Sequence, residues 1–114
     1  MDIHQTTRDG VTVLAPSGRI DTTTSARVDE RVRRTVDEGA RDLVIDFSDV
    51  EYISSAGLRV LLVLAKRMRD LQGRLVLCSL PESVRQVFRL AGFTPLFRIE
   101  ASQEAALATL ASRA

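Results

Sequence analysis

The chain has 114 residues, of which 45% are hydrophobic and 27% charged, and its formal net charge at pH 7 is +1. These values are typical of a single domain over residues 1–114, and with only six glycines and three prolines they exclude collagenous, low-complexity and disordered chains. The near-zero charge, with 4% aromatic residues and no tryptophan, argues against direct binding of nucleic acid.

Hydrophobic spacing divides the chain into alternating strands and helices. Apolar residues three or four positions apart, such as Val28, Val32 and Val36, predict helices, and short β-branched runs predict strands. Turn and cap signals such as Asp9-Gly10 mark the boundaries. In chain order, the predicted elements are strands at 3–7 and 11–15, a helix from 22–25 to Gly39, a strand at 43–45, a turn at 48–50, a helix from Ser54 or Ser55 to 72–73, a strand at 74–79, a helix from 81–83 to Gly92, a strand at 96–99, and a helix beginning at 102–104.

This order, ββαβαβαβα, predicts an α/β fold. Strands that alternate with amphipathic helices form a mostly parallel sheet through right-handed crossovers, and the opening hairpin adds an antiparallel strand. We therefore expect a four- to five-stranded mixed sheet with about four helices, and the pattern leaves open whether these cover one face or both. The second helix should be the most buried, because Val60, Val63 and Leu64 widen the apolar face formed by a repeat that includes Leu61 and Leu62.

Several other residues point to structural roles. Cys78 is the single cysteine and lies in an apolar run, which is typical of a small buried residue. Asp46 and Asp49 are explained by turn chemistry at least as well as by metal binding. The N-terminus lacks a secretory signal, and the longest apolar stretch, 60–65, is far shorter than the roughly 20 residues that span a bilayer. We expect a cytoplasmic protein with no membrane contact, metal or cofactor.

Two adjacent serines, Ser54 and Ser55, stand where the second helix is predicted to begin. A helix N-terminus has free backbone N–H groups and a partial positive charge, so it favours anions. A serine there can serve as an N-cap, worth about 1 kcal/mol over alanine, or as an exposed phosphoacceptor whose product anion the helix end tolerates. Both interpretations can hold, because one serine can cap while its neighbour stays free.

The same residues resemble the signature of STAS domains, in particular of the bacterial anti-sigma factor antagonists. Three segments carry the resemblance in the family's order, and together they extend it over nearly the whole chain: Gly18-Arg19-Ile20-Asp21, Ser54-Ser55-Ala56-Gly57-Leu58, and residues 81–93. The resemblance implies a STAS-like fold and a function in partner switching. In that family, the unphosphorylated antagonist binds an anti-sigma factor that is also a serine kinase, and this frees a sigma factor. The kinase then phosphorylates one serine, the complex dissociates, and a serine phosphatase restores the antagonist.

Counted back from Gly57, the family's acceptor position falls on Ser55, with Ser54 as the alternative because the shorter motif has aspartate there. Asp21 matches the family's loop aspartate near the acceptor. Arg59 is expected on the first turn, either paired with the phosphate or a partner carboxylate or simply solvated. The docking residues implied are Asp21, Thr22, Ser54, Ser55, Ala56, Gly57 and Arg59. The partners implied are the kinase and the phosphatase, and we expect a monomer or weak dimer.

Two other functions are weighed against this one. A serine at a strand-to-helix turn also occurs in hydrolases, but the Gly-x-Ser-x-Gly elbow and the Gly-x-x-x-x-Gly-Lys loop are absent. The only histidine, His4, lies in the first predicted strand and is expected at the surface. We therefore expect no catalysis. The nearer alternative is a STAS module that is never phosphorylated and docks constitutively, for example in a sensory or lipid-transport assembly.

Overall fold

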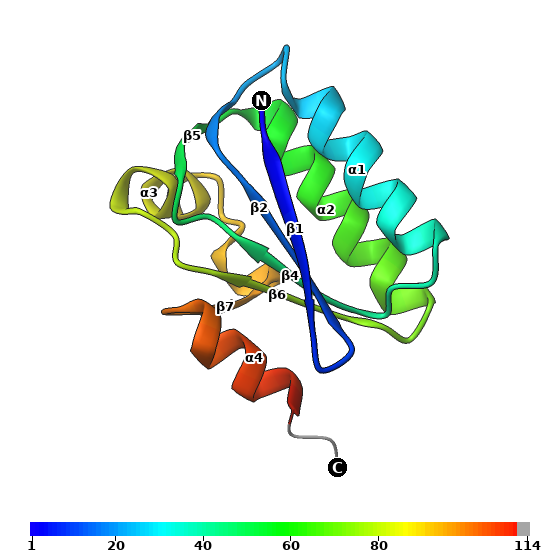
Figure 1. Cartoon of the computed structure of the whole chain (residues 1–114). Helices are drawn as coiled ribbons and strands as arrows, with labels where there is room; N and C mark the ends of the chain where they lie inside the picture. The colour runs from blue at the N-terminus through cyan, green and yellow to red at the C-terminus, as the bar shows by residue number, and fades with distance from the viewer. Residues whose placement is uncertain (112–114) are drawn as a thin grey trace.

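A computed structural model describes residues 1–111, which form four helices and two sheets (Figure 1). The elements are β1 (Ile3–Arg8), β2 (Val11–Pro16), β3 (Gly18–Ile20), α1 (Ser25–Asp37), β4 (Asp42–Asp46), β5 (Val50–Ile53), α2 (Ser55–Asp70), β6 (Arg74–Cys78), α3 (Glu82–Leu90), a 3-10 turn (Thr94–Leu96), β7 (Arg98–Glu100) and α4 (Gln103–Ala111). The predicted α/β class, with a five-stranded mixed sheet and four helices, is confirmed.

The larger sheet has the strand order β1-β2-β4-β6-β7. β1 and β2 form the antiparallel hairpin predicted around Asp9-Gly10, and the other neighbours in this sheet are parallel. β4 lies at the centre, and all five of its residues are buried. The predicted strand at 43–45 is confirmed, and it is covered on both faces.

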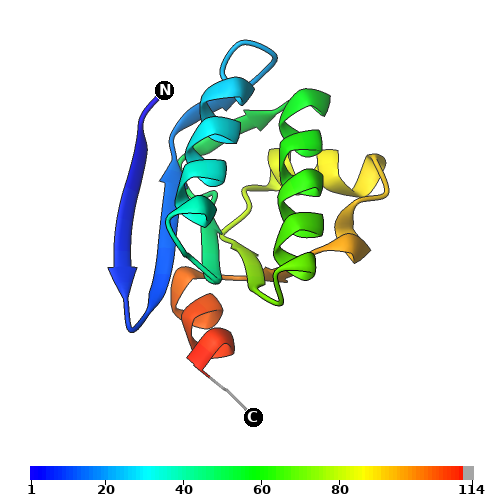
Figure 2. The ribbon, with the colours of Figure 1, turned by 90° about the vertical axis from the view of Figure 1, so that its right-hand side faces the viewer.

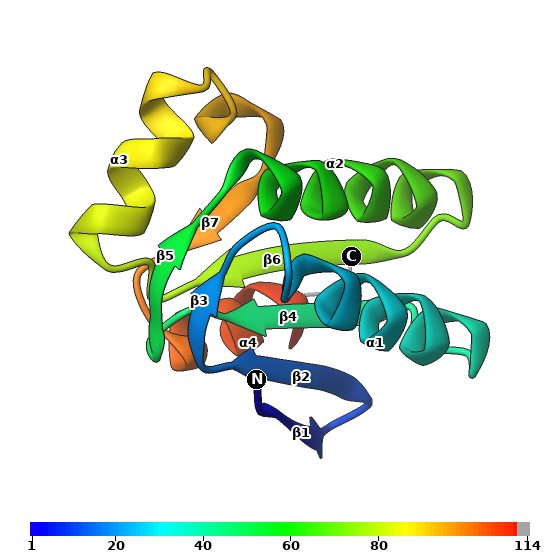
Figure 3. The same cartoon turned by 90° about the horizontal axis from the view of Figure 1, so that it is seen from above.

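Helices cover both faces of this sheet (Figure 3). On one face, α1 and α2 lie side by side and pack with α3 over a core that includes Leu43, Ile45 and Leu77. On the other face, α4 packs through Ala106 and Leu110. The side chains that α4 and the sheet enclose there include Val13, Val44, Val76 and Cys78. Cys78 is buried as predicted, and this burial raises the pKa of its thiol to about 11.

The second sheet, in which β3 pairs in parallel with β5, is absent from the predicted order. A turn is predicted at 48–50, whereas Val50 already begins β5, and no strand is predicted at 18–20, where β3 lies. Both strands are too short, with three and four residues, to show a clear period-two pattern. They are defined by pairing with each other, which a local pattern does not reveal.

The last strand also lies later than predicted. The predicted strand at 96–99 is a 3-10 turn at its start, and β7 is Arg98–Glu100. The 3-10 turn begins with Thr94-Pro95, and Pro95 has no N–H to donate to a sheet. The aromatic ring of Phe97 instead packs edge-on against Phe88 of α3, with ring centroids 5.7 Å apart.

Candidate functional site

The β3–β5 pair brings two helix N-termini together. Ile20 and Ile53 are register partners at the ends of these parallel strands, and the Ser54 N–H donates to the Ile20 carbonyl at 2.7 Å. Because parallel strands end at the same edge, the residues that follow, Asp21 and Ser54, leave the sheet side by side. Each then leads into a helix, α1 or α2. The predicted proximity of Asp21 to the serine pair therefore has its cause in this small sheet.

Ser54 and Ser55 occupy different positions at the start of α2. Ser54 is the N-cap: its backbone is extended, and its hydroxyl accepts a hydrogen bond from the Gly57 N–H at 3.3 Å. Ser55 is the first residue of the helix, and it is exposed. Ser54 thus caps the helix while Ser55 remains accessible, so the cap and the exposed hydroxyl that the sequence allows are both present.

Asp21 organises the loop before α1. Its carboxylate accepts hydrogen bonds from the backbone N–H groups of Thr24 at 3.0 Å and Thr23 at 2.9 Å. These bonds, with the Thr24 hydroxyl and the charge of Arg19, hold the pKa of the Asp21 carboxyl below its ordinary value of 3.8. The helix N-cap residue, Thr24, makes no side-chain cap bond, so the role expected of a hydroxyl at 22–25 falls to this carboxylate.

We expect Asp21→Asn to reduce stability at neutral pH and to match the parent protein in strong acid. The folded state favours the ionised carboxylate, because its pKa is lowered, so the stabilisation is present above pH 3.8 and is lost as the pH falls through the folded-state value. Urea denaturation of both proteins between pH 7 and pH 2 measures this difference. A stability gap that stays constant over the whole range would contradict the electrostatic origin.

A shallow groove extends from Ser55 between α1 and α2. It is lined on α2 by Ser55, Ala56, Arg59, Val60 and Val63, and on α1 by Asp29 and Arg33. Arg59 lies four residues after Ser55, which puts the two side chains on the same strip of the helix. Across the groove, Asp29 and Arg33 form an ion pair at 3.2 Å. Neither of these α1 residues was singled out in the sequence, although their four-residue spacing is visible there.

The predicted burial of α2 is wrong on one side. Val63 is 55% exposed and Leu62 is 39% exposed, whereas Leu58, Leu61 and Leu64 are buried. A helix with apolar residues over so wide an arc cannot bury all of them against one sheet. The uncovered residue Val63 becomes part of the groove instead.

Gly57 lies beneath this surface, where α2 contacts the β3–β5 pair. A Cβ atom at this position would lie 2.7 Å from the Ile20 Cγ2 and 2.7 Å from the Ile53 Cγ1. Glycine therefore permits the close approach that sets the position of Ser55. Of the predicted docking residues, Thr22, Ser55 and Arg59 are exposed, Asp21, Ser54 and Ala56 are partly exposed, and Gly57 is buried.

We expect Gly57→Ala to lower the free energy of unfolding by about 1–2 kcal/mol, since overpacking typically costs 1–3 kcal/mol and the helix propensity of alanine returns about 0.5–1 kcal/mol. Chemical denaturation checks the loss. A double-mutant cycle with Ile53→Ala, which removes one of the two clashing side chains, should show that Gly57→Ala is less harmful in that background. Strict additivity of the two changes would argue against the steric explanation.

The remaining candidates have structural positions. His4 is exposed on β1, as predicted. Asp49 is exposed in the turn between β4 and β5, whereas Asp46 is buried rather than part of an exposed loop. The Asp46 carboxylate accepts from the Ser48 N–H at 2.9 Å, which is the predicted turn chemistry, and from the Gln103 amide at 2.7 Å, which fixes the start of α4.

The family model for the STAS domain matches residues 2–106. BtrV of Bordetella bronchiseptica, named as a candidate anti-sigma factor antagonist, is 41% identical over 100 residues, which are 88% of this chain and 86% of BtrV. The crystal structure of an anti-sigma factor antagonist from Mycobacterium paratuberculosis is similar with a TM-score of 0.89 at 25% identity, over 97% of this chain and 94% of that one. Bacillus SpoIIAA in its phosphorylated form shares the fold, with a TM-score of 0.73 at 18% identity, over 96% and 99% of the two chains.

The chain belongs to the STAS domain family, and the resemblance found in its sequence is confirmed. Proteins of the anti-sigma factor antagonist group are regulatory binding proteins rather than enzymes, and the chain is one of this kind. Within residues 1–111, none of the helices combines the length and apolar character needed to cross a membrane.

Proposed function

We propose that the chain is an anti-sigma factor antagonist that works by partner switching, with Ser55 as its phosphorylation site. The observation that carries this proposal is the exposed Ser55 hydroxyl at the first turn of α2, beside a cap already formed by Ser54. Further support comes from the relatives named anti-sigma factor antagonists and from a protein of the same fold whose structure is of a phosphorylated form.

Ser55 is a better acceptor than Ser54 for two reasons. The Ser54 hydroxyl is partly buried and is engaged with the Gly57 N–H, so its modification would remove the N-cap. Loss of such a cap typically destabilises a helix by about 1 kcal/mol. Modification of Ser55 leaves the cap in place.

The partner in this proposal is a cytoplasmic anti-sigma factor with serine kinase activity. It docks over the two helix N-termini and the groove, where Asp21, Thr22, Ser55 and Arg59 are accessible to a neighbour. Ala56, Val60 and Val63 supply apolar contact area beside these polar groups. A serine phosphatase then removes the phosphate and restores binding.

The free protein can carry the phosphate with little strain. A phosphoserine adds a charge of about −1.5 to −2 at pH 7. At Ser55 the helix N-terminus and the cation of Arg59, one turn further along, both favour that charge. In the complex, the same charge lies close to Asp21 and loses its solvent, so phosphorylation acts on the interface and not on the fold.

The test is phosphosite mapping in the source organism. Mass spectrometry of the chain purified from its host, with and without the candidate kinase, should find phosphate on Ser55 and not on Ser54. Incubation of the pure chain with labelled ATP is the control and should give no label. Absence of phosphoserine under every growth condition would instead favour a STAS module that docks constitutively.

A further inference from the structure

β1 is an open edge of the larger sheet. It stands first in the strand order, and its outer side faces no other strand among residues 1–111 (Figure 2). Five of its six residues are exposed, and it contains neither proline nor lysine, two of the residues that commonly block edge strands. Such an edge presents a row of backbone N–H and C=O groups on which another extended segment can pair.

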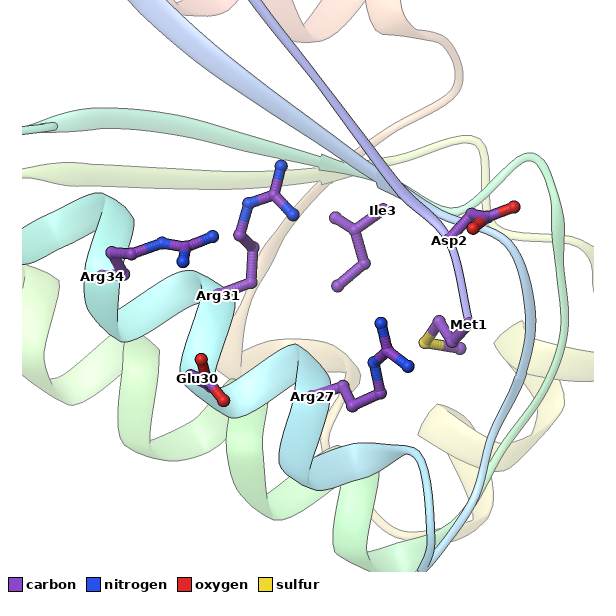
Figure 4. A pocket seen from close by; sticks show the side chains of 7 residues that line it. All are labelled: Met1, Asp2, Ile3, Arg27, Glu30, Arg31 and Arg34. Carbon is purple, nitrogen blue, oxygen red and sulfur yellow. The ribbon is translucent and has the colours of Figure 1, made fainter.

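A stripe of arginines on α1 lies beside this edge. Arg27, Arg31 and Arg34 line a hollow between α1 and the start of β1, and Figure 4 shows the side chains of Arg27 and Ile3 reaching into it. The Arg31 Nε donates to the Gln5 Oε1 at 3.2 Å, so the Arg31 side chain contacts β1 directly. Ile3 and Gln5 lie on the face of β1 that is turned toward α1. A strand added beside β1 would direct every second side chain to this same face.

The three arginines have no carboxylate partner in the described part of the chain. The ion pairs formed there involve Arg33, Arg67, Arg69, Arg74, Arg89 and Arg98. Asp2 and Glu30, the two carboxylates that line the hollow, take part in none of these ion pairs. With three arginines against two carboxylates, the hollow has an excess of one positive charge, and the unpaired guanidinium groups complement an anionic partner. A second copy of the chain would bring a like-charged stripe to the same place.

We propose that β1 and the arginine stripe form a docking site for an extended, acidic segment of a partner protein. The segment adds to the sheet as a strand beside β1, and its backbone pairs with the free edge. Its carboxylates, at alternate positions, face α1 and bind Arg27, Arg31 and Arg34. The site is separate from Ser55 and does not depend on the proposed phosphorylation.

The spacing of the two elements agrees with this arrangement. Alternate side chains of a strand are about 6.7 Å apart. Arg27 and Arg31 are separated by about 6 Å along the helix axis, and Arg31 and Arg34 by about 4.5 Å, at a rise of about 1.5 Å per residue. Glutamates at alternate positions therefore fall within reach of successive arginines, whose long side chains absorb the remaining mismatch.

The test uses a fluorescein-labelled peptide with glutamate at alternate positions and threonine between them, and fluorescence anisotropy measures its binding. The parent protein should bind the peptide, more weakly as salt is raised. The variant Arg27→Glu/Arg34→Glu should bind about tenfold more weakly or worse, since each reversal replaces an attraction with a repulsion. Lys66→Glu/Arg85→Glu, which reverses two exposed charges on α2 and α3 and so changes the net charge equally, is the matched control and should bind like the parent.

Two N-methylated peptides test the backbone pairing. Outward N–H groups alternate along a strand, so methylation at one set of alternate positions should abolish binding and methylation at the other set should not. Equal binding of both peptides, or no binding of the unmodified one, overturns the proposal. So does unchanged affinity of the Arg27→Glu/Arg34→Glu variant. Ser55→Asp should bind the peptide like the parent, and a loss there would place the peptide in the α1–α2 groove and overturn the proposal.

Discussion

Ser55→Asp is expected to weaken binding of the anti-sigma factor by about tenfold to a hundredfold, and Ser55→Ala is expected to bind as tightly as the unmodified chain. The aspartate places a permanent negative charge at the start of α2, in the docking surface and close to Asp21. In the complex that charge loses solvent without gaining a cation beyond Arg59. A phosphate carries more charge, and an unpaired charge at an interface typically costs about 2–5 kcal/mol, so phosphorylation should reduce affinity by roughly one to four orders of magnitude.

Calorimetric titration with the anti-sigma factor, once captured from its host, measures the difference. Ser102→Asp is the control for the added charge, because Ser102 also stands at a helix N-terminus, that of α4, where its hydroxyl accepts from the Ala105 N–H at 3.1 Å. That helix covers the other face of the sheet, so this variant should bind normally. Equal affinities for Ser55→Ala and Ser55→Asp would contradict the electrostatic switch, and equal losses at Ser55 and Ser102 would point to overall charge instead of position.

The elements that the sequence predicts well are those with local signals. Val28, Val32 and Val36 mark one face of α1 by spacing alone, and all three are buried. The run at 43–45 marks a central strand by composition. Ser54 and Ser55 could likewise be placed at a helix start from local cues, since a hydroxyl pair before a long apolar repeat is a cap signal.

What the sequence could not give is the pairing of β3 with β5. These strands are separated by the whole of α1 and β4, and their hydrogen bonds form only after both have been positioned. Asp21 lies beside Ser54 because of this pairing. The resemblance to the STAS family predicted that the two residues are close, and the structure shows why. The exposure of Val63 has a similar origin, because the apolar repeat of α2 does not say which flank α1 will leave uncovered.

Arg74 connects α4 to the sheet, and its loss is expected to have a large effect on stability. Arg74→Met is expected to lower the free energy of unfolding by about 2–3 kcal/mol, because it removes the hydrogen bonds of a charged guanidinium, which contribute about 1.5–3 kcal/mol, and the partial exposure of Arg74 moderates the loss. The Arg74 guanidinium makes two 3.0 Å hydrogen bonds to the carboxylate of Asp42, which is 8% exposed. It also donates to the Leu110 carbonyl at 2.8 Å, near the end of α4.

This arginine therefore joins two neighbouring strands to the helix that covers them. Asp42 and Arg74 are register partners on β4 and β6, and the Leu110 carbonyl, which accepts from Arg74, belongs to α4. A further polar attachment of α4 lies at its opposite end, from Gln103 to Asp46. Loss of Arg74 should loosen the C-terminal end of α4 before the rest of the sheet.

Urea denaturation followed by circular dichroism measures the global loss, with Arg89→Met as control. Arg89 pairs with Glu82 at 3.2 Å, but both side chains are more than half exposed, so that pair should contribute less than about 1 kcal/mol. Cys78 reports on α4 directly, because it lies in the cluster that α4 covers and burial raises its pKa to about 11. Its reaction with a thiol reagent at pH 8 should be slow in the parent protein and in Arg89→Met, and clearly faster in Arg74→Met. Equal labelling rates in all three proteins would mean that the Asp42–Arg74 pair does not hold α4 in place.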